Sequence, residues 1–269
     1  MEARHAHALG AQGVVVSRVG DDKLGQEIID RLRELGLRTD TLLIDPEHPT
    51  STVDVTVNSE GQPAYNIHEG VAWDYITYTD ELQSLQEDLD AVFFGTLASR
   101  NAVSRQSISQ FLETLNPECL RVFDVNLRQT YYSQGILQDL LKRTDVLKLN
   151  DDELYVFKEM FALEGDMMQM LEQLLASFHI QTIALTQGSR GSLLLNAEGK
   201  ENFSPPDNSH EIRDTVGAGD SFCAALALGL LQNMALSDIN RYANQIAGYV
   251  CSSNGATPAI PRHLTEHFQ

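Results

Sequence analysis

The stretch Arg213-Asp214-Thr215-Val216-Gly217-Ala218-Gly219-Asp220-Ser221-Phe222 places three small residues before an acid and is followed by an Ala/Leu run. Small residues at a helix start let backbone N–H groups point at an anion, with the positive end of the helix dipole behind them. We therefore expect an anion hole at Gly217, Ala218 and Gly219. Asp220 at its edge suits a base that takes a proton from a hydroxyl attacking phosphorus. The alternative is an ordinary helix start with an N-terminal acid.

The composition indicates a water-soluble α/β protein. The chain has 269 residues, enough for a full core, and a formal net charge of −19, which argues against nucleic acid and anionic membranes as partners. Its apolar runs are too short for a membrane span, and its start is too polar for a signal peptide. Cys119, Cys223 and Cys251 have no metal-binding spacing and indicate reduced thiols in the cytoplasm. We predict one domain over residues 1–269, with a lid hairpin inserted at about 48–72.

Strand and helix patterns alternate along most of the chain. A buried strand is expected over 13–19, and the period-2 pattern of 50–57, a turn at 59–63 and a strand at 64–68 predict a hairpin. The remaining order predicts a mostly parallel sheet with helices on both faces and ligands at the carboxyl ends of the strands. The other expected strands are 41–44, 91–95, 120–125, 145–149, 182–186, 191–196 and 200–203. The expected helices are 24–35, 102–115, 136–142, 151–161, 167–178, 218–231 and 237–252.

Polar residues stand at the ends of two of these strands. Asp124, Asn126 and Arg128 stand at the end of one strand, where their side chains could reach a ligand, although Asp and Asn also favour turns there. Asn150 and Glu153 follow the next strand. An amide and a carboxylate at this spacing could hold a hydrated Mg²⁺, and they equally fit an Asn N-cap with its capping-box Glu.

Two Gly-bearing loops could approach a nucleotide. Thr186-Gln187-Gly188-Ser189-Arg190-Gly191 follows a strand, and Asn254-Gly255-Ala256-Thr257-Pro258 follows the last long helix. Tight turns and helix stops use the same residues, so each pattern alone is weak. A GxxxxGK[ST] loop is missing from the sequence, which excludes a P-loop site, and no GxGxxG follows the first strand.

Taken together, these motifs resemble the ribokinase-like (PfkB) carbohydrate kinase family, over essentially the whole chain. The family's C-terminal signature runs from Asp214 to Ala227 as D-T-V-G-A-G-D-S-F-C-A-A-L-A. Gly20-Asp21-Asp22 with Gly25 and the strand-end motifs follow in the family's order. Glu69-Gly70-Val71-Ala72-Trp73-Asp74 looks like the lid of bacterial fructokinase-type members. The resemblance implies a three-layer ribokinase-like α/β fold with a small β-hairpin lid.

The resemblance also implies roles for individual residues. Asp220 is the implied general base toward a primary hydroxyl of the sugar, beside the amides of Gly217, Ala218 and Gly219. Asn150 and Glu153 are implied near Mg²⁺ and the ATP phosphates, and Arg128 and Asn126 near the sugar or the phosphates. Some relatives bind a monovalent cation such as K⁺ between the counterparts of Asp214, Val216 and the last loop. The implied nucleotide-binding residues are Asn150, Thr186, Gly188, Gly191, Asn244 and Gly255.

The sequence departs from the family at its start. Ala3, Gly10 and Gly20 fit the spacing of the N-terminal signature, which places Met1 where the signature has an Asn. The Gly-Gly pair, the first strand and its sugar-binding Asp have no counterpart. We therefore expect the first strand of the family to be missing, with poor sugar affinity and turnover as the consequence.

The expected activity is ATP- and Mg²⁺-dependent phosphorylation of a free sugar, with fructose as the first candidate. Ribose, tagatose and adenosine remain open, because the missing start carries part of the sugar pocket. A different class of function also remains open, namely a non-catalytic nucleotide-binding remnant. The lid hairpin suggests a homodimer by resemblance, and a monomer with a free flap is the alternative.

Overall fold

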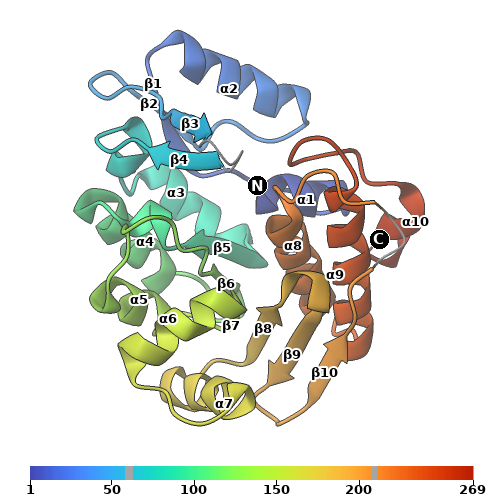
Figure 1. The fold of residues 1–269 in the computed structure, drawn as a ribbon. Helices are drawn as coiled ribbons and strands as arrows, with labels where there is room; N and C mark the ends of the chain where they lie inside the picture. The colour runs from blue at the N-terminus through green and yellow to red at the C-terminus, as the bar shows by residue number, and fades with distance from the viewer. Residues whose placement is uncertain (58–62, 208–210, 269) are drawn as a thin grey trace. The chain divides into compact units, whose positions relative to one another are not determined.

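A computed structural model describes residues 1–57, 63–207 and 211–268 (Figure 1). The helices are α1 (Glu2–Ala8), α2 (Lys23–Glu34), α3 (Asp80–Leu85), α4 (Ala102–Glu113), α5 (Gln134–Leu141), α6 (Asp151–Phe161), α7 (Met167–Phe178), α8 (Ala218–Leu231), α9 (Leu236–Cys251) and α10 (Arg262–Thr265). The strands are β1 (Ser17–Gly20), β2 (Leu42–Asp45), β3 (Val53–Val57), β4 (Pro63–Ile67), β5 (Ala91–Gly95), β6 (Leu120–Asp124), β7 (Val146–Asn150), β8 (Thr182–Thr186), β9 (Ser192–Asn196) and β10 (Glu201–Ser204).

The chain divides into two compact units. The first comprises residues 1–13, 86–97 and 112–269, and the second comprises residues 14–85 and 98–111. A six-stranded sheet in the order β10-β9-β8-β7-β6-β5 forms the centre of the first unit. Strands β5 to β8 are parallel, while β9 and β10 run antiparallel to their neighbours. The predicted mostly parallel sheet is thereby confirmed.

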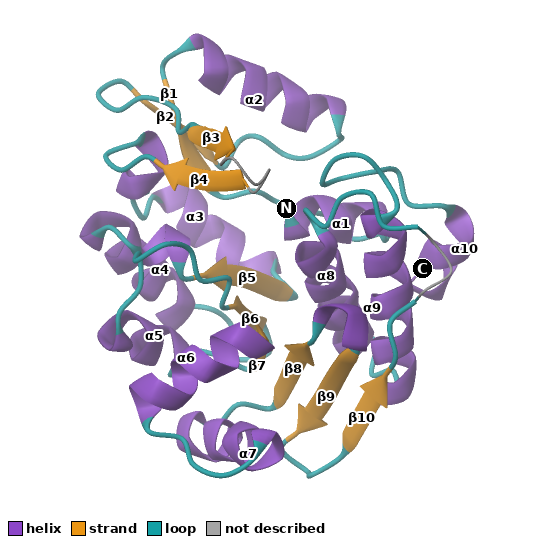
Figure 2. Cartoon of the chain, in the orientation of Figure 1, coloured by secondary structure: helices purple, strands orange, loops and turns teal. Residues whose placement is uncertain are grey.

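The sheet of the first unit is buried on both faces. Val122, Val146, Ala184 and Leu194 of four adjacent strands share one hydrophobic cluster with buried residues of α8 and α9, which are labelled in Figure 2. Neighbouring residues of a strand point to opposite faces, and those next to this cluster are fully buried as well. The other face therefore needs its own cover, and the fully buried leucines of α5 and α7 belong to the same unit. Within the described ranges, none of the helices combines the length and apolar character that crossing a bilayer requires.

Side-chain caps explain where several helices begin. Asp22, Ser133 and Asp166 accept a hydrogen bond from the backbone N–H three residues later, at the starts of α2, α5 and α7. Such caps satisfy backbone donors that have no partner inside the helix. The helices over 24–35, 136–142, 151–161 and 167–178 were predicted from the sequence, and the structure confirms them within two residues at each end.

The second unit holds two small sheets. β1 and β2 are parallel, and β3 and β4 form the antiparallel hairpin. The segment after this hairpin is fixed by a buried ion pair. Arg100 donates from Nε to Asp74 Oδ1 at 2.7 Å and from Nη2 to Asp74 Oδ2 at 2.9 Å, and its guanidinium lies 4.0 Å from the ring centre of Trp73. Arg100 also donates to the carbonyl of His68.

The first expected strand needs correction. Residues 13–16 lie outside β1, apart from an isolated bridge between Val14 and Arg38, and Val16 is exposed. Among the described strands β1 pairs with β2 alone, so the Val-rich run has no sheet partner on its other side there. The sequence patterns also missed the helix α1. The predicted turn over 59–63 falls almost entirely outside the described residues.

We expect Arg100→Met to destabilise the protein strongly. The substitution leaves the Asp74 carboxylate, which is 2% exposed, without its cation. Breaking a buried pair from one side costs about 3–5 kcal/mol, and urea denaturation would measure the loss.

The matched control is Arg31→Met. Arg31 pairs with Glu34 on the surface of α2, where its side chain is 65% exposed. Such pairs contribute about 0–1 kcal/mol, so the control should unfold near the wild-type midpoint. Equal midpoints for the two variants would contradict a structural role of the buried pair.

Candidate active site

The start of α8 depends on one left-handed glycine. Gly217 has φ +86° and caps the helix, and its carbonyl accepts the N–H of Ser221 at 2.9 Å. This region of φ favours glycine over residues with a Cβ. A Cβ on Gly217 would also overlap the carbonyl oxygen of Ala256. The turn that directs the first amides of α8 therefore requires glycine for two independent reasons.

A buried histidine holds the loop that covers Gly217. The Nε2 atom of His5, on α1, lies 3.1 Å from the carbonyl oxygen of Ala256, and His5 is 1% exposed. Burial lowers the pKa of His5 to about 4, so the ring is neutral at pH 7. The carbonyl can only accept, so Nε2 carries the proton in this contact. The helix that the sequence patterns missed thus positions the loop of the predicted residue Gly255.

Asp220 lies in the first turn of α8, and its side chain is 16% exposed. Burial raises the pKa of Asp220, and the nearby carboxylate of Glu2 raises it further. The amino group of Met1, 3.5 Å from Asp220 Oδ1, and the ammonium of Lys148 act in the opposite direction. A carboxylate whose pKa is raised takes up a proton more readily than an exposed one, which suits a general base.

A buried ion pair lies behind this turn, and sequence reasoning missed it. Lys148 Nζ donates to Asp124 Oδ1 at 2.9 Å, with both side chains less than 10% exposed. Burial is the largest single influence and opposes the charge of Lys148, but attraction to Asp124, the hydrogen bond to it and weaker attractions together raise the pKa of the lysine. A Cβ on Gly219 would meet Lys148 Nζ at 3.0 Å. A charged residue between Leu147 and Leu149 in an apolar strand was the available sequence signal.

Asn150 and Glu153 form a capping box at the start of α6. Asn150 Oδ1 accepts the N–H of Glu153 at 2.8 Å, and Glu153 Oε2 accepts the N–H of Asn150 at 2.8 Å. Glu153 Oε1 accepts the N–H of Leu127 at 2.9 Å. The glutamate therefore ties the loop after β6 to the end of β7. Each carboxylate oxygen keeps a second lone pair, which fits an ordered water better than direct coordination of a metal.

Several predicted nucleotide-binding residues lie side by side at the strand ends. Asn150 and Thr186 are register partners across β7 and β8, and Thr186 and Ser192 are partners across β8 and β9. Asn244, on α9, donates from Nδ2 to Ser192 Oγ at 2.6 Å. The strand ends and α9 are thus joined at one edge of the sheet, which in α/β folds is where ligands bind.

The two glycines of the 186–191 turn are explained by different features of their surroundings. Gly188 has φ +54° and would meet nothing within 4 Å if it carried a Cβ, so this side of the turn is open. Gly191 has φ +104°, and a Cβ there would overlap the carbonyl oxygen of Ser204. Packing in the fold is therefore sufficient to explain Gly191. The open face at Gly188 leaves room for a ligand.

The structure of the loop after β6 gives less support to the predicted ligand contacts of Asn126 and Arg128. Asn126 has φ +42°, the conformation of a turn-forming Asn. Arg128 is exposed, and its Nη1 donates a long hydrogen bond of 3.4 Å to the carbonyl of its neighbour Leu127. The structure therefore places Arg128 on the surface, and this contact does not show whether it faces the sugar or the phosphates.

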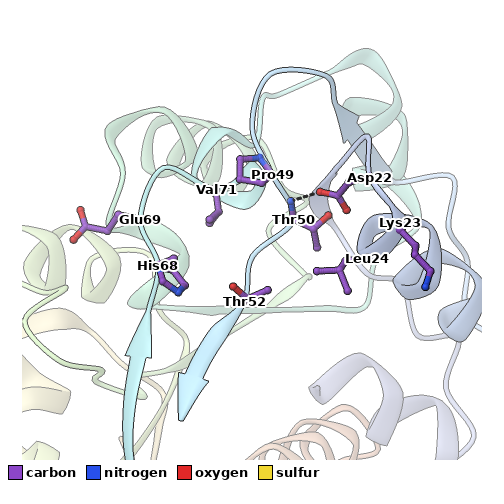
Figure 3. A pocket seen from close by; sticks show the side chains of 9 residues that line it. All are labelled: Asp22, Lys23, Leu24, Pro49, Thr50, Thr52, His68, Glu69 and Val71. Atoms are coloured by element: carbon purple, nitrogen blue, oxygen red, sulfur yellow. Dashed lines mark hydrogen bonds between the residues drawn. The ribbon is translucent and has the colours of Figure 1, made fainter. Parts of the chain in front are cut away.

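A pocket of about 560 Å³ lies in the second unit (Figure 3). Asp22 forms part of its wall and accepts the N–H of Thr50 at 2.8 Å, which Figure 3 shows as a dashed line. Its lining is Asp22, Lys23, Leu24, Pro49, Thr50, Thr52, His68, Glu69 and Val71. Most of this lining lies in the predicted lid segment of about 48–72, and Asp22 belongs to the Gly20-Asp21-Asp22 motif. The residues that the resemblance assigns to catalysis or nucleotide binding do not line this pocket.

Comparison with known proteins gives one family for the whole chain. The family model described as pfkB family carbohydrate kinase matches residues 2–263. An uncharacterized sugar kinase of Pyrococcus horikoshii is 26% identical over 257 residues, which cover 92% of this chain and 77% of that protein. The fructokinase of Vibrio alginolyticus is 24% identical over 265 residues, covering 94% of this chain and 84% of that protein.

Solved structures support the same fold. The crystal structure of the Xylella fastidiosa fructokinase with bound ATP matches with a TM-score of 0.86 at 17% identity, covering 99% of this chain and 88% of that one. Relatives of similar identity also include a D-beta-D-heptose 7-phosphate kinase of Bordetella bronchiseptica, so the matches span different sugars.

We expect Gly217→Ala to disable the anion hole. The new Cβ would push the Ala256 carbonyl away from the turn and force an unfavourable φ on the helix start. Affinity for ATP, measured by calorimetry, should fall about tenfold or more, which corresponds to about 1.4 kcal/mol.

Gly199→Ala is the matched control. Gly199 has a similar φ of +76°, in the turn between β9 and β10, but a Cβ there would meet nothing within 4 Å. This variant should lose a little stability and keep its ATP affinity. An unchanged affinity in Gly217→Ala would contradict the assignment of the anion hole.

Proposed function

The chain belongs to the pfkB family of carbohydrate kinases and is an ATP-dependent sugar kinase, and from this premise we propose its reaction and substrate. The proposed reaction is transfer of the γ-phosphoryl group of ATP to a primary hydroxyl of a free sugar, with fructose as the first candidate. Asp220 is the proposed general base, and the amides of Gly217, Ala218 and Gly219 stabilise the group in transfer.

The observation that carries the proposal is the position of Asp220. An acid beside an anion hole repels a phosphate, so its presence needs a task other than phosphate binding. Asp220 takes the proton of the sugar hydroxyl, the hydroxyl oxygen forms a bond to the γ-phosphorus, and ADP leaves with the electrons of the broken P–O bond. Preorganised amides at the start of α8 suit the charge that develops on the phosphoryl oxygens.

The residues present fit Mg²⁺ held through water. Mg²⁺ keeps several of its own waters in most protein sites, and Glu153 and Asn150 offer oxygen atoms at the strand end. In the described part of the chain there is no cluster of three or more His, Cys, Asp or Glu side chains that could hold a metal directly. The ion supplies neutralisation of phosphate charge, while this chain's residues orient its waters. Thr186, Gly188, Asn244 and Gly255 are the proposed neighbours of the nucleotide.

The substrate proposal rests on the names of relatives and stays within the sugar kinases. Fructokinases recur among them at 22–24% identity, and a heptose phosphate kinase matches at 25%. Ribose, tagatose and adenosine are therefore the alternative substrates. A non-catalytic nucleotide-binding protein is the alternative from another class, and it gives no reason for an acid beside the anion hole. We place the enzyme in the cytoplasm, where ATP is available and the free cysteines stay reduced.

We expect Asp220→Ala to abolish sugar phosphorylation. Loss of a general base typically lowers the rate about 10²–10⁴-fold, and ATP affinity should stay close to the wild-type value. A coupled ADP-release assay with Mg²⁺, with and without K⁺, on fructose, ribose, glucose, tagatose and adenosine would measure this and identify the substrate.

Asp238→Ala is the matched control, because it also removes an acidic residue from the first turn of a helix. Asp238 lies in the first turn of α9 and pairs with the exposed Arg241. Turnover of this variant should match the wild type. Wild-type turnover by Asp220→Ala would contradict the base assignment, and binding of ATP without turnover on any sugar by the wild type would favour the non-catalytic alternative.

The β3–β4 hairpin supports a proposed homodimer. Val53 and Val55 point to one face of β3 and are 48% and 55% exposed, which leaves aliphatic side chains in water. A second copy of the hairpin is the proposed cover. We expect a dimer in light scattering after size exclusion, and a monomer for Val55→Lys, because a buried lysine without a partner opposes association.

Ile212→Lys is the matched control, since Ile212 is an aliphatic residue 66% exposed outside the hairpin. This variant should remain dimeric. A monomeric wild type, or dissociation by both lysine variants alike, would contradict pairing through the hairpin.

A further inference from the structure

Lys148 is a charged residue in the middle of a buried parallel strand. Its neighbours Leu147 and Leu149 are fully buried, and Lys148 itself is 6% exposed. Strands covered on both faces are normally apolar throughout, and lysine is almost never buried without a partner. The packing of β7 therefore does not explain why residue 148 is a lysine.

Asp124 explains how the buried charge of Lys148 is tolerated, but it accepts a hydrogen bond from one of the ammonium donors and leaves the others unused. The two residues are register partners across β6 and β7, and one hydrogen bond of 2.9 Å joins them. An ammonium group has three donors. Among the described residues, Asp124 Oδ1 is the one acceptor within hydrogen-bond distance of Lys148 Nζ. The ammonium also approaches Gly219, where a Cβ would come within 3.0 Å of Nζ.

The ammonium of Lys148 lies near the start of α8, where a cation is unfavourable as long as no anion is bound. The N-terminus of α8 already carries the positive end of the helix dipole, and a second positive charge beside it is repelled. Once an anion binds at the turn, both positive charges attract it. A cation at this place therefore makes physical sense when the anion is present, and Asp124 offsets its charge when the anion is absent.

We propose that Lys148 is a positioning residue of the anion hole, which adds its positive charge from beneath Gly219 to the amides that hold the transferring phosphoryl group. This inference rests on the kinase function proposed above and assigns a residue that the family motifs of the sequence did not. Lys148 acts through the electric field and through the glycine it faces, whereas Asp220 acts on the substrate itself. A preorganised charge of this kind counts most in the transition state, where charge on the phosphoryl group is redistributed.

The competing explanation is a pair that only stabilises the sheet. The double variant Lys148→Gln with Asp124→Asn separates the two, because it keeps a hydrogen-bonded neutral pair and leaves no buried charge unpaired. If the charge of Lys148 matters, kcat should fall about 10–100-fold while KM for the sugar and Kd for ATP change less than about threefold. Removing a direct oxyanion donor lowers kcat about 10²–10³-fold. The expected decrease is smaller here, because Lys148 does not itself contact the phosphoryl group.

Binding of a transition-state mimic gives a readout other than turnover. ADP with aluminium fluoride imitates the phosphoryl group in transfer, and its affinity should fall by the same factor as kcat in the neutral pair. Asp124→Asn alone keeps the cation and removes its counter-charge. In that variant the full chain should bind ADP with aluminium fluoride at least as tightly as the wild type does.

The matched control is Arg121→Gln with Asp145→Asn. These two residues form an ion pair of 3.4 Å near the start of β6 and just before β7, whereas Asp124 and Lys148 lie further along the same strands. This variant should lose comparable stability and keep kcat and the affinity for the mimic.

The outcomes separate cleanly. Wild-type kcat in the neutral Lys148–Asp124 pair, or weaker binding of the mimic in Asp124→Asn than in the neutral pair, would overturn the inference while leaving the kinase function standing. Absence of sugar-dependent turnover in the wild type would overturn the proposed function and, with it, this inference. A selective loss of kcat and of mimic affinity, absent from the control, would support it.

Discussion

The left-handed conformation of Gly217 is the constraint on which the rest of the site depends. It ends the loop from Asp214 and starts α8 in one residue. Side chains do not cap this helix start, although the N–H of Ala218 makes a long bond of 3.4 Å to the carbonyl of Thr215. The Ala256 carbonyl occupies the space that a side chain would need, and His5 fixes that carbonyl from α1. Residues from both ends of the sequence therefore define one backbone angle.

Charge is the second constraint, because the whole molecule carries −19 and a kinase must hold a polyanion. In the proposed site, oriented amides and the buried ammonium of Lys148 meet this need locally, while most of the acids among the described residues lie on the surface. Asp124 keeps that ammonium compatible with a dry interior, and Glu2 acts on Asp220 in the opposite sense, by favouring its protonated form. The same short region thus contains a buried cation and a carboxylate whose pKa is raised, the two groups on which the proposed phosphoryl transfer relies.

Local patterns predicted the elements of the first unit well. Strands β5 and β8 match their predicted bounds, and α8 begins at the residue expected from Gly217. The failures share one cause, which is dependence on distant partners. Residues 13–16 have a strand-like composition but lack pairing, and α1 is short and polar, so its packing against α8 could not be read from periodicity. The Lys148–Asp124 pair joins residues 24 positions apart, and only the sheet register brings them together.

The capping box at Asn150 shows why the structural and the functional explanation of a motif need not exclude each other. Its four atoms satisfy the backbone at the start of α6, as the spacing of Asn150 and Glu153 alone would require. The bond from the N–H of Leu127 to Glu153 goes further, since it fixes the neighbouring strand end as well. A carboxylate held by two backbone N–H groups, one on each oxygen, has few alternative orientations, so its remaining lone pairs point in defined directions. Rigidity of this kind is what a water-mediated magnesium site requires, and a helix cap is an efficient way to produce it.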